Sequence, residues 1–170
     1  KSIEVEDFGR GCPVDWNPAE KRFNWELVYC ELYAGGKYKN DDGGDYEYSL
    51  GLNGLGACAT QYASEYMDVT VWRDGNKYSL HFAKGKIKGK MLVEPSDRKK
   101  TGTTTRWKPD IEVFTDINIP ESYFLDILRR QAVVNAGVTF RFRAQHGAKF
   151  ETTEFCYKNG IADYVAELAG

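Results

Sequence analysis

Hydrophobic positions along the chain change their spacing several times, and each spacing predicts a different element. Helical spacing appears first at Phe23, Leu27, Cys30 and Ala34. We expect this helix to begin at Asn17-Pro18, where proline suits a first turn, and to end near Ala34, before two glycines. A second one-sided apolar stripe, from Leu55 to Tyr66, predicts another helix.

Alternation of apolar and polar residues predicts strands elsewhere. Ile3 and Val5 alternate with charged residues and indicate a short half-buried strand. Residues 68–73 and 77–83 are expected to form a hairpin through Asp74-Gly75-Asn76, a strong turn signal. The remaining expected strands are 102–108, stopped by Pro109, and the hairpin of 138–145 with 149–158.

Two more helices complete the pattern. One is expected from about 120 to 135, between Pro120 and Gly137, and a short one follows Asn159-Gly160. Helices and hairpins therefore alternate without regular βαβ units. This order predicts an α+β protein, with a mixed, mostly antiparallel sheet covered on one face by helices in a two-layer sandwich.

Charge adds an asymmetry to an otherwise ordinary composition. The net charge is −2, which argues against a generally basic nucleic-acid binder. Residues 1–68 carry six Lys and Arg against 13 Asp and Glu, whereas residues 84–108 carry nine against two. The basic stretch 84–108 is either a solvated face or a DNA-contacting surface, and the second interpretation would depend on Lys86, Lys88 and Lys99.

The cysteines and the apolar runs indicate in which cellular compartment the protein is expected. Four cysteines, at 12, 30, 58 and 156, form no CxxC pair, which excludes a common zinc pattern and predicts reduced, mostly buried thiols in a cytoplasmic protein. No apolar run approaches the roughly 20 residues that span a bilayer. The chain opens on a strand without an initiator Met, so we expect it to be cut from a longer protein.

Residues 49–64, SLGLNGLGACATQYAS, place glycines at 51, 54 and 56 directly before a predicted helix. Backbone N–H groups at such a helix start can hold a phosphate. The stretch lacks the GK[ST] of a Walker A loop and the GxGxxG order of a dinucleotide-binding loop. Taken alone it is either a phosphate loop of another kind or a tight turn before a helix.

A second glycine motif, DFGRG at 7–11, follows the first predicted strand. A carboxylate beside two glycines can put a hydrogen-bond acceptor in a closely approached pocket, as the amino group of adenine requires. The alternative for Asp7 is an Asx turn at a strand end.

Together the two motifs resemble a known superfamily. DFGRGCPVD is similar to the DxGxGIPV motif of the GHKL ATPases, which share the Bergerat fold, and GLNGLGACATQYAS is similar to their GxxGxG lid. ELVYCELYAGGKY, GTTTRWKPDIEVFTD and LRRQAVVNAGVTFRFR resemble, within that superfamily, the B subunits of bacterial DNA gyrase and topoisomerase IV. The resemblance runs from about Val5 to Leu168.

The resemblance implies an adenine pocket. Asp7 would bind the adenine amino group, Thr103 would share that site, and Gly9 and Gly11 would let the backbone approach the base. The pocket wall, where aminocoumarin inhibitors also bind in the family, would include Arg10, Pro13 and Arg73. Cys12 stands where the family usually has isoleucine.

The resemblance also implies a phosphate lid. The family's lid tyrosine and phosphate-facing lysine correspond to Tyr46 and Lys37, and the backbone donors to Leu52, Asn53, Gly54, Leu55 and Gly56. Asn53 replaces a frequent histidine, which leaves a backbone role intact. Leu50 replaces a frequent glycine, which would stiffen the lid hinge.

The family's catalytic machinery is not assigned to any residue here. Its catalytic glutamate and Mg²⁺-binding asparagine lie upstream of DxGxG on an N-terminal helix that this sequence lacks, and its phosphate-sensing lysine lies downstream, in the transducer domain. We therefore expect an ATP-binding domain at 1–158 and a helix at 159–170 that leads into the transducer, with no catalytic or metal-binding residue. Glu4, Glu6 and His81 are not promoted to a catalytic base.

The implied function is that of the parent enzyme, a type IIA topoisomerase that uses ATP and Mg²⁺ to drive DNA supercoiling. Its partners would be the gyrase A subunit, double-stranded DNA and a second copy of the B subunit. The piece alone would be inactive in hydrolysis. Three alternatives stay open: the decatenating topoisomerase IV, a DNA-contacting module through 84–108, and a catalytically dead paralogue.

Overall fold

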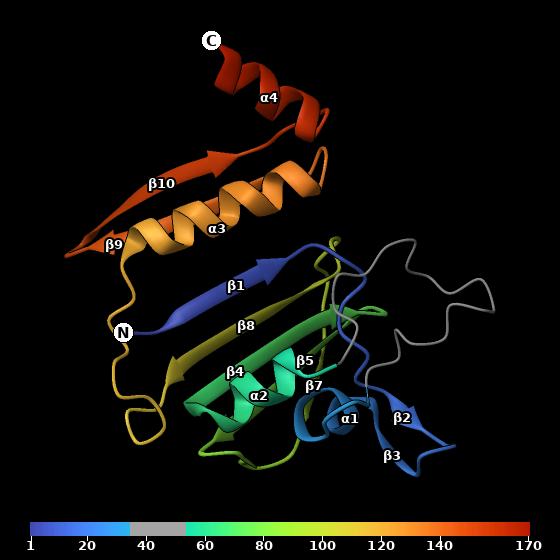
Figure 1. The fold of residues 1–170 in the computed structure, drawn as a ribbon. Helices are drawn as coiled ribbons and strands as arrows, with labels where there is room; N and C mark the ends of the chain where they lie inside the picture. Colours follow the sequence, from blue (N-terminus) through green and yellow to red (C-terminus); the bar gives the residue numbers. More distant parts are fainter. Residues whose placement is uncertain (35–53) are drawn as a thin grey trace. The chain divides into compact units, whose positions relative to one another are not determined.

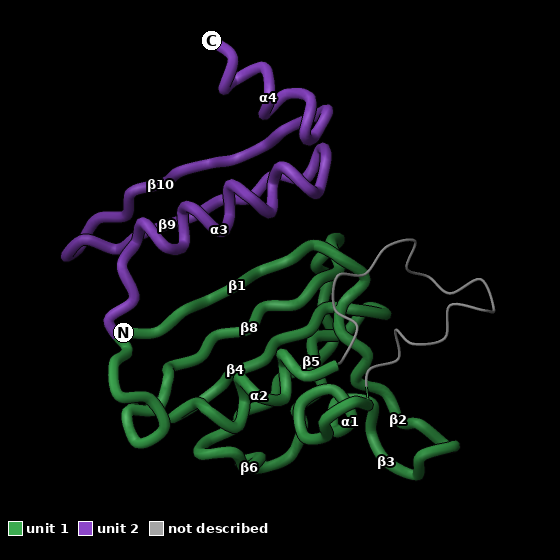
Figure 2. Tube along the Cα trace, viewed as in Figure 1, with its two compact units in different colours: residues 1–117 green, residues 118–170 purple. Residues whose placement is uncertain are grey.

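The computed structural model of the chain describes residues 1–34 and 54–170. These residues form two compact units, residues 1–117 and residues 118–170 (Figure 2). The prediction of a boundary near residue 158 stays a prediction.

The first unit contains an antiparallel sheet in the order β1–β8–β4–β5–β6, with β7 also paired to β5 (Figure 1). Its strands are β1 (Ile3–Asp7), β4 (Ser64–Arg73), β5 (Asn76–Ala83), β6 (Lys86–Ile87), β7 (Leu92–Pro95) and β8 (Gly102–Pro109). The predicted β4–β5 hairpin is present, and its turn residues Asp74 and Gly75 both have positive φ, as a tight hairpin turn requires. The predicted α+β class with mostly antiparallel strands is confirmed.

Two helices, α1 (Asn24–Cys30) and α2 (Gly56–Tyr62), lie over one face of this sheet (Figure 1). A short hairpin of β2 (Trp16–Asn17) and β3 (Arg22–Phe23) precedes α1. In Figure 1 the helices lie over β4 and β5 rather than over β1. Val5 on the edge strand β1 is consequently 54% exposed, more than its alternating pattern predicts.

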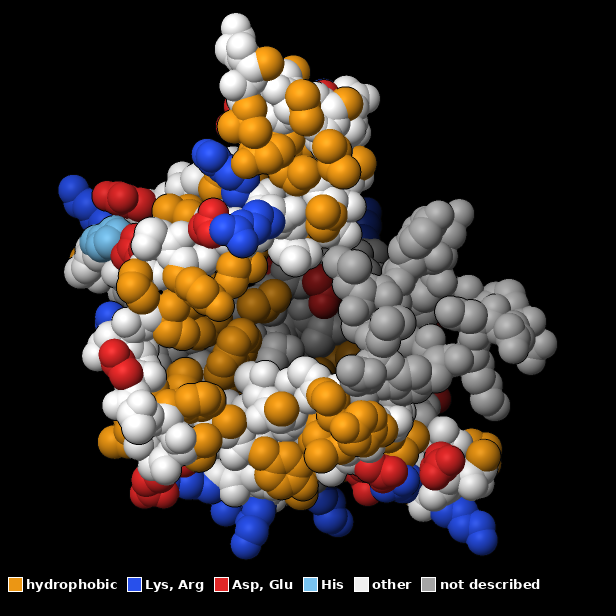
Figure 3. Space-filling model, in the orientation of Figure 1, with side chains coloured by type: hydrophobic (Ala, Val, Ile, Leu, Met, Phe, Trp, Pro, Cys, Tyr) orange, Lys and Arg blue, Asp and Glu red, His pale blue; other side chains and the backbone are white. Residues whose placement is uncertain are grey.

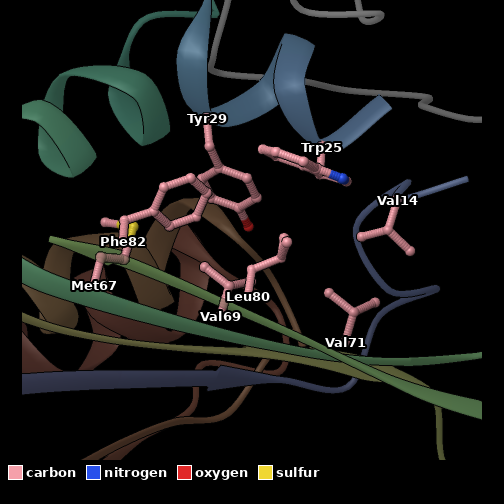
Figure 4. Close-up of a cluster of buried hydrophobic side chains, with 8 residues drawn as sticks. All are labelled: Val14, Trp25, Tyr29, Met67, Val69, Val71, Leu80 and Phe82. Atoms are coloured by element: carbon pink, nitrogen blue, oxygen red, sulfur yellow. The ribbon is translucent and has the colours of Figure 1, made fainter. Parts of the chain in front are cut away.

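The hydrophobic core lies between the helices and the sheet. Trp25 and Tyr29 of α1 point down toward Val69, Leu80 and Phe82 of the sheet (Figure 4). The inward positions of β4 and β5 are almost completely buried because every second residue of a strand points to the same face. This packing fixes α1 directly above the sheet.

The predicted start of the first helix is wrong. The backbone N–H groups of Ala19 and Glu20 both bond the side-chain oxygen of Asn17, at 3.1 and 3.2 Å, and hold a turn instead of a helix. The helix begins only at Asn24, where the Glu26 carboxylate accepts a hydrogen bond from the N–H of Phe23 at 3.2 Å.

The predicted end of the second helix is also wrong. The stripe was expected to run to Tyr66, but α2 ends at Tyr62 and β4 begins at Ser64. The Ser64 hydroxyl bonds the carbonyl oxygen of Thr60 at 2.6 Å and closes the last turn. Tyr66 instead pairs with Ala83 in the sheet, because inward packing of β4 outweighs local helical spacing.

The second unit contains the predicted helix α3 (Glu121–Val134), the predicted hairpin of β9 (Phe140–His146) and β10 (Lys149–Phe155), and α4 (Ile161–Ala169). Phe124 of α3 stacks on Phe142 of β9 with ring centroids 5.8 Å apart. Figure 3 shows hydrophobic side chains on the surface of the second unit. On α4, Ile161, Val165 and Leu168 are exposed. Each helix in the described residues is too short or too polar to span a bilayer.

Phe82 offers a test of the core. Its side chain has no exposed area, and its ring centroid lies 6.0 Å from that of Trp25 and 5.8 Å from that of Tyr29. We expect Phe82→Ala to lower the free energy of unfolding by about 3–5 kcal/mol, because the cavity cannot close against two rings. Urea unfolding measures this. Leu92→Ala on exposed β7 is the control, expected within about 0.5 kcal/mol of the unmodified chain; equal losses in both variants would contradict the packing.

Candidate functional site

Three residues on neighbouring strands form one row at the end of the sheet. Asp7 of β1 pairs with Thr103 of β8, and Thr103 pairs with Val71 of β4. Because Val71 points into the core under α1, its row partners point to the same face of the sheet. Directly paired side chains lie about 4.5–5.5 Å apart at their Cβ atoms. The sheet thus puts a carboxylate and a hydroxyl side by side.

The turn after β1 arranges the hydrogen bonds of Asp7. One carboxylate oxygen, Oδ1, accepts a bond from the N–H of Gly9 at 2.9 Å. This is the Asx turn that the sequence left open as an alternative. The bond uses one acceptor position, whereas a carboxylate has about four. An Asx turn and an exposed acceptor are therefore compatible in the same residue.

Two glycines allow backbone segments to approach closely around this turn. A Cβ on Gly102 would lie 2.0 Å from the carbonyl oxygen of Asp7, and one on Gly11 would lie 2.9 Å from the carbonyl oxygen of Trp72. Both have positive φ, +149° and +81°. Any side chain would push the turn away from the sheet.

Thr103 also ties the following loop to the sheet. Its hydroxyl oxygen accepts a bond from the N–H of Cys12 at 2.9 Å, so the hydroxyl proton is left to donate elsewhere. The side chain of Cys12 interacts with the Tyr29 hydroxyl of α1, and burial raises the pKa of both groups. Cys12 is thus a protonated thiol that packs, partly buried, against the core.

The three residues expected at the pocket wall have different surroundings. Arg73 ends β4, and its guanidinium lies 2.9 Å from Asp74, 3.8 Å from Asp15 and 3.5 Å from the carbonyl oxygen of Cys12. It therefore borders the loop that carries Cys12, and it is not an unconnected surface charge. Arg10 and Pro13 are exposed positions in that same loop.

The glycine-rich stretch before α2 is described only from Gly54 onward. Gly54 has φ +59°, Leu55 precedes the helix, and Gly56 is its first residue. The carbonyl oxygen of Leu55 accepts a bond from the N–H of Ala59 at 2.8 Å. The other expected phosphate-side residues, Lys37, Tyr46, Leu52 and Asn53, together with Leu50, lie outside the described residues.

Other titratable groups are placed away from the row. Successive residues of β1 point to opposite faces of the sheet, so Glu4 and Glu6 point to the face opposite that of Asp7. On that face the Nδ1 atom of His81 lies 2.5 Å from the Asp68 carboxylate. Among residues 1–34 and 54–170, no group of three His, Cys, Asp or Glu side chains is arranged to hold a metal.

Several cations of the basic stretch are already paired. Lys84 lies 3.1 Å from buried Asp110 and 2.7 Å from Glu112, and Lys108 lies 2.5 Å from Glu65. The backbone N–H of Glu112 and the nearby Lys84 hold the pKa of Asp110 below its usual range. This pairing reduces the positive charge that the stretch can offer to DNA.

Sequence reasoning missed Gly102 and Tyr29. The TGTTTR stretch was noted for Thr103. The preceding residue, Gly102, is the one at which the backbone of β8 lies closest to the carbonyl oxygen of Asp7. Its position at the start of a strand was the available signal. Tyr29 lies in a helical stripe and gave no sign that it reaches Cys12.

Comparison with known proteins gives a consistent result, although no family model matches the sequence. The chain is 34% identical over 168 residues to the B subunit of DNA topoisomerase 4 from Salmonella typhimurium, covering 98% of this chain. It is 36% identical over 169 residues to the B subunit of DNA gyrase from Thermus thermophilus, covering 99%. It spans about a quarter of these relatives, 26% of each.

Solved structures agree. The 43K ATPase domain of Thermus thermophilus gyrase B, in complex with an aminocoumarin, superposes with a TM-score of 0.76 at 30% identity and covers 99% of this chain and 40% of that one. The ATP-binding domain of topoisomerase IV from Francisella tularensis, in complex with a small-molecule inhibitor, gives 0.77 at 27% identity and covers 98% and 43%.

The close approach at Gly102 predicts a strong steric effect. We expect Gly102→Ala to lower the free energy of unfolding by about 3 kcal/mol or more, because the new methyl group meets a backbone carbonyl rather than a movable side chain. Gly56→Ala is the control, since nothing lies within 4 Å of its Cβ position, and it should stay within about 1 kcal/mol. Thermal unfolding of both variants measures the two losses of stability. If Gly102→Ala were as stable as Gly56→Ala, the close backbone approach at Gly102 would be refuted.

The thiols predict an order of alkylation. All four cysteines are free, but only Cys58 is buried; Cys12 and Cys30 are partly exposed and Cys156 is exposed, so the prediction of mostly buried thiols is wrong. Burial raises the pKa of Cys30 to about 11 and also raises that of Cys12. Since only the thiolate reacts, iodoacetamide at pH 8 should modify Cys156 first, and labelling of Cys12 and Cys30 should increase only as the pH rises further. Peptide mass spectrometry follows each site; fast labelling of Cys30 at pH 8 would contradict this order.

Proposed function

We propose that the chain is part of the ATPase region of a B subunit of DNA gyrase or topoisomerase IV, as its relatives indicate, and that it binds ATP through the turn and strands around Asp7 and Thr103. One observation carries the proposal. The Asp7–Thr103–Val71 row holds a hydrogen-bond acceptor beside a hydroxyl donor, at a place where two glycines bring backbone close.

The chemistry of this pair is complementary to adenine. Adenine presents an amino donor at N6 next to an acceptor at N1. Asp7 keeps acceptor positions after bonding Gly9, and the Thr103 hydroxyl keeps its proton after accepting from Cys12. We assign Asp7 to the amino group and Thr103 to the same edge of the base. Gly9, Arg10, Gly11, Pro13 and Arg73 are proposed to form the surrounding wall, which would also take aminocoumarin-type inhibitors.

The phosphate side of the proposal rests on the stretch before α2. Gly54, Leu55 and Gly56 are proposed to direct backbone N–H groups at the triphosphate, together with Lys37, Tyr46, Leu52 and Asn53. Bound Mg²⁺ would neutralise phosphate charge, as it does in nucleotide-hydrolysing enzymes. We assign none of this chain's described residues to the metal, because none forms a suitable acidic group.

For the whole protein we propose an ATP-hydrolysing type IIA DNA topoisomerase of the cytoplasm. In the parent enzyme, ATP would close two copies of this domain as a gate around a DNA segment, with gyrase A and double-stranded DNA as partners. This chain's residues would bind and orient the nucleotide. We propose no hydrolytic activity for the chain alone, since none of its described residues is assigned as a general base.

Gyrase and topoisomerase IV are both represented among the relatives, at 34–36% identity. We propose the B subunit of gyrase first and that of topoisomerase IV as the alternative. The activity of the full-length protein distinguishes them, since gyrase supercoils DNA and topoisomerase IV decatenates it. The DNA-contacting alternative is less favoured because Lys84 and Lys108 in the basic stretch are paired with carboxylates.

ATP binding to the 170-residue chain tests the proposal. We expect isothermal calorimetry to detect ATP, and Asp7→Asn to weaken binding by roughly tenfold or more, because a buried amino donor would lose its charged acceptor. Asn has nearly the same shape as Asp, so the turn should persist.

Glu4→Gln is the matched control, since Glu4 lies on the same strand but points to the opposite face. It should leave the affinity within about twofold. If Asp7→Asn and Glu4→Gln bound ATP equally well, Asp7 would not contact adenine and the proposed site would be wrong.

A further inference from the structure

The loop between β7 and β8 contacts the underside of the Asp7 turn, on the face of the sheet opposite the nucleotide side. Glu6 and Trp72 both point to this face, because each is next in sequence to a residue of the inward row. Arg98 from the loop reaches both of them. These contacts lie outside the nucleotide site proposed above, yet they involve the residues directly beside it.

Arg98 makes three of these contacts with one guanidinium. Its Cζ atom lies 3.9 Å from the centroid of the Trp72 ring and 5.8 Å from that of Phe8. Its Nη2 atom donates to the Glu6 carboxylate at 3.0 Å. A planar guanidinium can stack its flat face on an indole while an N–H at its edge bonds a carboxylate, whereas a lysine ammonium has no flat face to stack.

Two neighbours of Arg98 hold the next residues of the turn. The Lys100 ammonium lies 5.1 Å from the centroid of the Phe8 ring, and the Thr101 hydroxyl donates to the carbonyl oxygen of Gly9 at 2.7 Å. Loop residues 98, 100 and 101 therefore contact Glu6, Phe8 and Gly9 in the same order along the turn. Asp7 is the residue enclosed by these contacts.

We propose that Arg98 is a positioning residue for adenine recognition: it holds the Glu6–Gly9 turn against the sheet and so fixes where the Asp7 carboxylate points. This rests on the proposed function, because it assigns Asp7 to the adenine amino group. Arg98 contacts no nucleotide itself. It acts through Glu6, Phe8 and Trp72 on the far face of the sheet.

The charge and exposure of the cluster support this role. Phe8 is 63% exposed, so its ring is not held by core packing, and the cations of the loop are the contacts that restrain it. The Arg98 side chain is only 25% exposed although it is charged. A partly buried, stacked and paired guanidinium is restrained far more than an ordinary surface arginine.

The test compares ATP with inosine triphosphate, which carries a carbonyl group in place of the adenine amino group. We expect Arg98→Ala and Trp72→Leu to weaken ATP binding by roughly five- to tenfold while changing inosine triphosphate binding less than about twofold. Trp72→Leu removes the stacking surface without altering charge. Lys99→Ala, which removes a cation between Arg98 and Lys100, is the matched control and should leave both affinities unchanged.

A second measurement needs no nucleotide. Hydrogen exchange of the Gly9 amide, bonded to Asp7, and of the Cys12 amide, bonded to Thr103, reports whether the turn is held. Both amides should exchange faster in Arg98→Ala and Trp72→Leu than in Lys99→Ala, while the buried amides of β4 keep their protection. That protection also shows that the variants are folded.

The outcomes separate the two proposals. Unchanged exchange in Arg98→Ala, or equal weakening of both nucleotides, would overturn the positioning role. Faster exchange combined with no effect of Asp7→Asn on ATP would retain the role of Arg98 in holding the turn but refute the assignment of Asp7 to adenine.

Discussion

The antiparallel pairing of β1 with β8 is the interaction on which the described site depends. β1 is the edge strand of its sheet, and its register against β8 decides that Asp7 stands beside Thr103. A shift by one residue would turn Asp7 to the opposite face and replace it with Glu6. The register is protected at its end by Gly102, whose missing side chain lets the two backbones meet.

The same strand pair separates two tasks between the two faces of the sheet. The face toward α1 carries the carboxylate, the hydroxyl and the loop with Cys12, and the other face carries Glu6, Trp72 and Arg98. The residues proposed to bind adenine and those proposed to support them are therefore next to each other in sequence but on opposite faces of the sheet. Such a division follows from the two-residue period of a strand.

The core connects the site to the rest of the first unit. Tyr29 packs on Phe82 at the centre of the cluster and also interacts with Cys12 at the edge of the site. Val71 belongs both to the core and to the row of Asp7 and Thr103. Close packing of the core beneath the site therefore holds its residues in place, although Asp7 itself lies on an exposed edge strand.

The sequence by itself determined the α+β class, the β4–β5 and β9–β10 hairpins and helix α3, because alternation, turn glycines and helical spacing are local signals. It singled out Asp7 by a carboxylate beside two glycines, whereas Thr103 entered only through the family resemblance. The sequence prediction misplaced the start of α1, because the Asn17 side chain stabilises a turn where a helix was expected. It also misplaced the end of α2, because Tyr66 pairs with Ala83 in the sheet. Only the tertiary structure decided that Tyr29 reaches Cys12, that Gly102 meets Asp7, and that Arg98 stacks on Trp72. These contacts join residues 17 to 95 positions apart or depend on strand register, and no local pattern of side chains encodes such distances.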